Sequence, residues 1–310
     1  MNDMLHVFPD YYKEFKCINR QCRHNCCIGW EIDIDEATSE KYKSEGGQLG
    51  ERLRDNIEWG ENPHFILGDG ERCPFLNCDN LCDIICEKGE GMLCSICADH
   101  PRFRCELPGR IETGLGLCCE AAGALILAKK DPVTLEITGE AETDDEIVEL
   151  RDKIISVLQN REKSIDARVE EMLSMCNSDV PEMTREEIAD FFLSLERLDE
   201  KWTEQLNYLK NGEADMEGFA RYMKGRETEY EQLLVYLIYR HFANSPDEWE
   251  ASARAAFAAF SYRLICRLGA LHYVRCGSFS FEDQVELCRL FSSEIEYSDE
   301  NLYEVIELMY

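Results

Sequence analysis

Hydrophobic residues in this chain change their spacing about midway along it. From about residue 144 onward they recur at intervals of three and four, as in Leu233, Leu234, Leu237 and Ile238, which is the spacing of amphipathic α-helices. Breaks rich in Pro, Gly, Asn and Ser divide this pattern. The predicted helices cover residues 144–176, 184–211, 215–243, 247–275 and 280–309.

Two of these predicted helices begin with a recognisable N-terminal signal. Thr184 is followed by Glu187 three residues later, which fits a capping box, and Ser280 with Asp283 weakly resembles one. The second half of the chain is therefore predicted to form an α-helical bundle.

The first half has no sustained helical period and is rich in turn-forming residues. Apolar and acidic residues alternate from Trp30 to Asp35, which predicts a short half-buried strand. Further short elements are predicted: helices at 37–42, 49–59, 93–98 and 115–127, and a strand at 133–137. The fold class is therefore mainly α, with an irregular Cys-rich metal-binding N-terminal domain containing short strands (residues 1–130) and a C-terminal helical bundle (residues 131–310).

Thirteen of the 17 cysteines lie between Cys17 and Cys119. A chain of 310 residues can bury a full-sized core and does not need disulfides to stabilise it, and an odd total forbids complete internal pairing. Thiolates bind soft or borderline metals, and spacings of two to four residues let neighbours converge on one ion or cluster. The donors are nearly all sulfur, with only His24 and His100 nearby, which modestly favours an iron–sulfur cluster over zinc.

The acidic composition narrows the choice of partners. With 63 acidic and 33 basic residues the net charge is −30, which repels nucleic acid and anionic membrane surfaces. No secretory signal and no apolar run of membrane-spanning length is apparent, so the expectation is a cytoplasmic protein with reduced thiols and no membrane partner.

The order of motifs resembles that of a known family. The resemblance rests on Tyr11-Tyr12-x2-Phe15-x-Cys17-x4-Cys22-x3-Cys26-Cys27-x-Gly29-Trp30, Cys73-Pro-Phe-Leu76, Leu81-Cys82, Leu93-Cys94-x2-Cys97-x3-Pro101-Arg102 and Cys118-x-Glu120-Ala121. This set is similar to the flagellin lysine N-methylase family, FliB, within a wider group that carries a zinc- or iron-chelating cysteine domain.

The resemblance implies methyl transfer from S-adenosylmethionine to lysine side chains of flagellin or a similar protein, with a cysteine-bound [4Fe-4S] cluster. The implied metal ligands are Cys17, Cys22, Cys26, Cys27, Cys73, Cys82, Cys94, Cys97 and Cys118. Cys119 stands where the family usually has Pro, and Gly123 stands where a basic residue is common.

A lysine methylase must first remove a proton from the substrate amine, whose usual pKa is about 10.4. Tyr11, Tyr12, Asp99 and Glu120 are the nearest candidate bases in sequence, and none is singled out as catalytic. Arg102 is the predicted contact for the carboxylate of S-adenosylmethionine, because a guanidinium matches that group bidentately; the alternative is a structural salt bridge.

Two other functions fit the same cysteines. The first is a non-enzymatic protein that stores or senses zinc or iron. The second is a structural zinc module that stabilises an interaction domain, which chelation of the metal would unfold.

Overall fold

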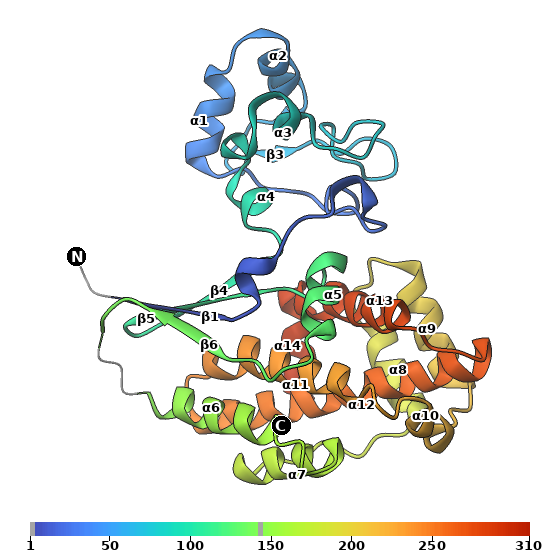
Figure 1. The fold of residues 1–310 in the computed structure, drawn as a ribbon. Helices are drawn as coiled ribbons and strands as arrows, with labels where there is room; N and C mark the ends of the chain where they lie inside the picture. Colours follow the sequence, from blue (N-terminus) through green and yellow to red (C-terminus); the bar gives the residue numbers. More distant parts are fainter. Residues whose placement is uncertain (1–3, 142–144) are drawn as a thin grey trace. The chain divides into compact units, whose positions relative to one another are not determined.

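The structure is a computed structural model that describes residues 4–141 and 145–310. Figure 1 shows two compact units. Residues up to Phe15 together with Phe103–Tyr310 form the larger unit, and Lys16–Arg102 form the smaller one. This division by compactness differs from the expected boundary after residue 130, which stays a prediction about domains.

A four-stranded sheet organises one side of the larger unit, with strand order β4-β5-β1-β6. Its central strand β1 (Leu5–Pro9) runs parallel to β5 (Arg110–Leu115) and antiparallel to β6 (Leu135–Thr138), while β4 (Arg102–Leu107) lies at the edge. The register pairs Val7 with Glu112 and with Ile137. The first strand therefore depends on partners that lie far along the chain.

Helices make up the rest of the larger unit and confirm the mainly α fold (Figure 1). They are α5 (Glu120–Ala128), α6 (Glu146–Leu158), α7 (Ile165–Met175), α8 (Arg185–Ser194), α9 (Glu200–Asn211), α10 (Met216–Tyr222), α11 (Glu227–His241), α12 (Glu248–Cys276), α13 (Phe281–Phe291) and α14 (Asp299–Glu307). Helix α11 packs against α5, α6 and α12 and is buried on nearly every side, so it forms the centre of this core.

Most of the long predicted helices are interrupted. Only α12 spans its predicted range as one helix; the others are pairs, such as α6 and α7 within 144–176. The predicted start at residue 144 lies outside the described residues. A π-helix, Ser292–Glu296, separates α13 from α14 within the range 280–309. Both predicted capping boxes, at Thr184 and Ser280, are present.

The helix predicted at 115–127 begins later than expected. Leu115 ends strand β5, and α5 starts at Glu120, so Cys118 and Cys119 precede the helix instead of lying in its middle. Among the helices that the structure describes, none has the length and apolar character needed to cross a membrane.

The smaller unit has short elements around a small core. They are α1 (Glu36–Ser44), α2 (Gly47–Asp55), β2 (Ile57–Glu58), β3 (His64–Phe65), α3 (Asp83–Lys88) and α4 (Ser95–Asp99). The predicted strand at Trp30–Asp35 is wrong, because only one bridge, between Asp33 and His64, forms there. The apolar residues of this stretch are nevertheless buried as the alternating pattern predicts, since Ile32 and Ile34 are each only 3% exposed.

Candidate metal centre

Six of the nine predicted ligand thiols lie in or beside the core of the smaller unit, and one of them, Cys26, is exposed. They come from separate stretches of sequence: Cys26, Cys27, Cys73, Cys82, Cys94 and Cys97. The pKa of Cys27 is raised by Cys26, by burial and also by Cys73 and Cys82. The pKa of Cys97 is raised by Cys94, by burial and also by Cys27 and Cys73. These mutual effects indicate that the thiols are near one another. The loops and short helices of this unit thus bring the thiols into one region, although no three of these sulfurs, all of which the structure describes, lie within 4.8 Å of one another.

Backbone hydrogen bonds hold the first two of these stretches together. The Cys73 amide donates to the Cys27 carbonyl at 2.8 Å, and Ile28 forms a bridge with Arg72. The Cys27 amide in turn donates to the Asn25 side-chain oxygen at 3.0 Å. These bonds hold the backbones of Cys27 and Cys73 beside each other.

Two other thiols stand at the starts of helices. Cys82 is the N-cap of α3 and Cys94 is the N-cap of α4. Burial raises the pKa of Cys82, although backbone amides of the first turn of α3 partly oppose this. The pKa of Cys94 is lowered, first by the Cys97 side chain and then by backbone amides. Such amides favour the thiolate, which is the form that binds a metal.

Two pairs of thiols, Cys26 with Cys27 and Cys94 with Cys97, shift each other's pKa in opposite directions. The Cys27 thiol donates to Cys26, which lowers the pKa of Cys26 to about 7 and raises that of Cys27. Cys97 donates to Cys94 in the same way and lowers the pKa of Cys94. Burial raises the pKa of Cys73 to about 11, so this thiol requires a cation to lose its proton readily.

This donor set fits a thiophilic metal or an iron–sulfur cluster. The site offers more than the four sulfurs that one zinc ion or one four-iron cluster needs, and the position is largely shielded from water. A separate group, Glu31, Asp33 and His64, has ligand atoms within 4.8 Å of one another but contains no sulfur and lies largely exposed.

The remaining predicted ligands lie elsewhere. Cys17 is exposed and lines a hollow of about 440 Å³ with residues 16–21 and Leu81. The Cys22 thiol donates to the His24 carbonyl at 3.1 Å. Cys118 belongs to the larger unit. The ligand assignments of these three residues stay predictions.

Arg102, the predicted contact for the donor carboxylate, is the last residue of the smaller unit. Its guanidinium lies 3.4 Å from the Ala98 carbonyl, at the end of the segment that carries Cys94 and Cys97. Contact with S-adenosylmethionine stays a prediction.

Sequence reasoning missed the residues that support the thiols. The buried Tyr42 ring lies beside Cys94, Cys97 and Cys82, and its hydroxyl donates to the Met92 carbonyl at 2.9 Å. Asp35 caps α1 and also accepts from the amide and hydroxyl of Ser95, both at 2.8 Å. The helix-start signal at Asp35 was visible in the sequence, but its second partner, sixty positions later, was not.

The larger unit contains a buried polar cluster formed by Tyr236, Arg240, His241 and Glu296. Glu296 accepts from the Tyr236 hydroxyl at 3.0 Å and lies 2.7 Å from His241 Nε2. The Tyr236 hydroxyl also accepts from Arg240 at 2.7 Å and from the Leu117 amide at 3.2 Å. This cluster therefore anchors the segment that carries Cys118.

Tyr297 extends the cluster to Cys118. Its ring lies 4.7 Å from the Arg240 guanidinium, and its side chain hydrogen-bonds to the Cys118 thiol. A Cβ atom on Gly116 would come within 2.1 Å of the Tyr297 hydroxyl, so a glycine is required for this close approach. Burial raises the pKa of Cys118 to about 12.

The four residues of the polar cluster, Tyr236, Arg240, His241 and Glu296, lie in a part of the chain that is similar to known proteins. Residues 180–310 match the family model of the FliB lysine N-methylase C-terminal domain. Over this part, the chain is similar to the FliB family. The family expected from the cysteine motifs is confirmed, although the matching family model covers the helical part of the chain.

Individual FliB relatives show the extent of the likeness. The chain is 27% identical over 145 residues to proteins named lysine-N-methylase from Salmonella typhimurium and Salmonella choleraesuis, covering 44% of this chain and 35% of each relative. It is 28% identical over 145 residues to the flagellar biosynthetic protein FliU of Salmonella muenchen, covering 84% of that protein. The match thus spans about a third of the length of the two lysine-N-methylases. No solved structure matches the chain.

The four candidate bases lie in both units. Tyr11, Tyr12 and Glu120 belong to the larger unit, and Asp99 belongs to the smaller one. Tyr11 is only 5% exposed, and burial raises its pKa, so it is a core residue that holds its proton firmly. The Tyr12 ring lies 5.5 Å from the Phe8 ring, centroid to centroid, in a tilted arrangement. Glu120 is the first residue of α5, and Asp99 is the last residue of α4 in the smaller unit. Asp99 and Glu120 are half-buried carboxylates, and Tyr12 is a half-buried phenol.

Proposed function

We propose that this protein is an S-adenosylmethionine-dependent protein lysine N-methylase that uses a cysteine-bound [4Fe-4S] cluster. The observation that carries the proposal is the match of residues 180–310 to the FliB lysine N-methylase C-terminal domain. The names of its relatives, lysine-N-methylase and flagellar biosynthetic protein, support a lysine-bearing protein substrate such as flagellin. We place the reaction in the cytoplasm, where thiols stay reduced.

The proposed cluster ligands are drawn from the six gathered thiols. Cys26 and Cys94 are the strongest candidates, because their hydrogen-bonding partners already favour the thiolate. Cys73 and Cys82 come from different segments and would complete a four-sulfur set. A bound iron–sulfur cluster supplies a centre that exchanges electrons, with a potential set by its surroundings.

The methyl transfer needs only polar chemistry from this chain. A carboxylate or phenolate takes one proton from the lysine ammonium, and the amine lone pair then forms a bond to the methyl carbon. The bond between that carbon and the sulfonium sulfur breaks, and its electron pair stays on sulfur as a neutral thioether. The net charge of −30 favours both a cationic donor and a cationic lysine.

Anaerobic purification followed by iron, sulfide and zinc analysis tests the cofactor. We expect about four irons and four sulfides per chain. Cys94→Ser should lower the iron content, whereas Cys276→Ser, which removes an exposed thiol of the larger unit, should leave it unchanged. Stoichiometric zinc without sulfide would instead support the structural zinc alternative.

Mass spectrometry of flagellin incubated with S-adenosylmethionine tests the reaction. We expect mass increments of one methyl group on lysine residues, and none when the donor is omitted. A folded, metal-loaded protein that methylates neither flagellin nor other lysine-bearing proteins would refute the activity.

A further inference from the structure

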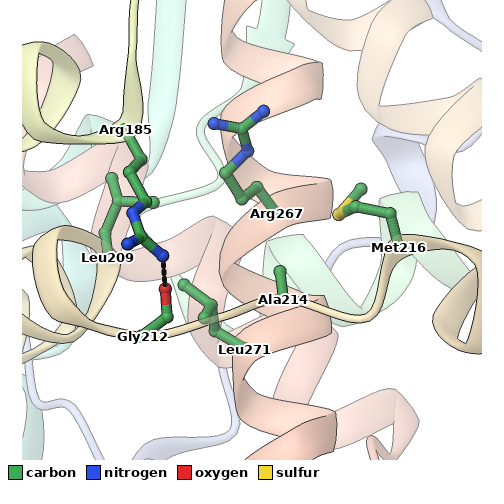
Figure 2. A pocket seen from close by; sticks show the side chains of 7 residues that line it. All are labelled: Arg185, Leu209, Gly212, Ala214, Met216, Arg267 and Leu271. Atoms are coloured by element: carbon green, nitrogen blue, oxygen red, sulfur yellow. Dashed lines mark hydrogen bonds between the residues drawn. The ribbon is translucent and has the colours of Figure 1, made fainter.

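A small cavity in the larger unit combines two arginines with an apolar wall. Its volume is about 170 Å³, and it lies among the start of α8, the connection from α9 to α10, and the middle of α12. Figure 2 shows its lining: Arg185, Leu209, Gly212, Ala214, Met216, Arg267 and Leu271. All of these residues belong to the region that matches the FliB family model.

One wall of the cavity is bare backbone. A Cβ atom on Gly212 would lie 2.7 Å from the Tyr208 carbonyl and 2.9 Å from Leu271 Cδ2, so no larger side chain fits without displacing its neighbours. The Gly212 carbonyl accepts a hydrogen bond from Arg185 (Figure 2). This bond fixes the Arg185 guanidinium at the edge of the cavity. Its Nε donates to the Glu186 carboxylate at 3.1 Å, which leaves Nη2 to serve a ligand.

Arg267 is the unusual member of the set. It is half-buried on α12, yet it has no hydrogen bond or ion pair with any residue that the structure describes. Other arginines with comparable or deeper burial in this unit have carboxylate partners: Arg168 with Glu231, Arg226 with Glu229, and Arg254 with Glu250. In a chain with about twice as many acidic as basic residues, a half-buried arginine without a carboxylate keeps its donors available for an anion.

The positive character of this position extends along α12. Arg275 lies two turns beyond Arg267, and its guanidinium is 5.2 Å from the Tyr208 ring, the same residue whose carbonyl abuts Gly212. The apolar part of the cavity comes from Leu209 and Leu271, both of which are buried. A ligand that contacts both the arginines and the apolar wall has an anionic group and a short hydrocarbon chain.

We propose that this cavity binds a small organic carboxylate with a short apolar chain, paired with Arg267 and Arg185. Its volume of about 170 Å³ has room for a small carboxylate with a short chain. A guanidinium binds a carboxylate through two parallel hydrogen bonds. The chain of the ligand lies against Leu209, Leu271 and Ala214.

Isothermal titration calorimetry of the full-length protein with hexanoate tests this proposal, with hexanol and hexylamine as probes of equal length. We expect hexanoate to bind with a dissociation constant below about 1 mM, and both other probes to bind at least about tenfold more weakly, because an ion pair and its two hydrogen bonds are lost. Equal binding of hexanol would show an apolar hollow only and would overturn the proposal.

Substitution of the unpaired arginine locates the site. Arg267→Gln should weaken hexanoate binding at least about tenfold. Arg263→Gln is the matched control one turn earlier on α12, since Arg263 is exposed and pairs with Glu170, and it should bind as the wild type does. Hexanoate binding that is the same for Arg267→Gln and the wild type would refute the site.

A second variant tests the cavity without removing an arginine. Ala214→Leu keeps both arginines but fills the cavity, so it should also abolish hexanoate binding while its circular dichroism stays that of the wild type. Binding that survives both Arg267→Gln and Ala214→Leu would place any hexanoate elsewhere on the protein and contradict the proposal.

Discussion

At the scale of single residues, the Glu296 carboxylate of the larger unit is a buried charge held by several partners. Burial alone would raise its pKa, but Arg240 and the hydrogen bond to His241 lower it to about 2. Burial also lowers the pKa of His241, so the histidine acts there as a neutral hydrogen-bond partner. The attraction to Arg240 therefore gives Glu296 its charge in the folded protein.

Glu296→Gln should destabilise the protein in a pH-dependent way. Removing one charge of a buried pair leaves Arg240 without its counter-charge, which costs about 3–5 kcal/mol at neutral pH. Because the folded pKa is depressed to about 2 from an ordinary 4.5, this contribution is present above pH 4.5 and is lost as the pH falls toward 2. Urea denaturation across this range measures the difference between variant and wild type.

Exposed Glu304→Gln is the control for this measurement and should change the stability by less than about 0.5 kcal/mol. A stability difference between Glu296→Gln and the wild type that does not shrink on acidification would contradict the assignment of a charged Glu296.

Tyr236→Phe should destabilise the protein by about 1–3 kcal/mol. The change removes a hydroxyl that bonds to Leu117, Arg240 and Glu296, and it leaves the Leu117 amide without that acceptor. Urea denaturation measures the loss, and Tyr303→Phe, whose ring is 60% exposed, is the neutral control. Equal stability of the two variants would show that the hydroxyl network contributes nothing.

At the scale of elements, Asp35 links two helices of the smaller unit that are far apart in sequence. It caps α1 through the Thr38 amide and holds the start of α4 through Ser95. Since Cys94 precedes Ser95 directly, the same carboxylate helps to place one of the gathered thiols.

Asp35→Ala should lower the stability of the smaller unit by about 2–3 kcal/mol, the sum of one helix cap and the bonds to Ser95. Hydrogen exchange should quicken in Glu36–Ser44 and Ser95–Asp99 together. Asp55→Ala, at the exposed end of α2, should leave both segments unchanged. Faster exchange in α1 alone would show that the link to Ser95 is not stabilising.

The elements that the sequence predicts well are those with local signals. The capping boxes at Thr184 and Ser280 mark real helix starts, and the periodic run of α12 is one helix. Strand β1 and the hairpin of β4 and β5 were missed, because a strand is stabilised by partners that its own sequence does not reveal. The sequence predicts that cysteines lie near one another. Which of the nine predicted ligands share a region depends on the paths of the loops, which the spacing of the cysteines does not determine.

At the scale of the whole molecule, the two units should respond differently to loss of metal. The core of the smaller unit contains few residues, whereas that of the larger unit is extensive. Stripping the metal anaerobically with a chelator should therefore abolish hydrogen-exchange protection in residues 16–102 while α11 and α12 keep theirs. Unchanged protection in both units would show that the thiols are not needed for folding.

The placement of β1 has a consequence for synthesis on the ribosome. Its partners β5 and β6 follow the whole smaller unit in sequence, so β1 emerges first and has no sheet to join. The six thiols, by contrast, are all translated before β5. If these thiols hold the metal that we propose, its loading can precede closure of the sheet during translation, because residues 16–102 are complete before β5 and β6 are made.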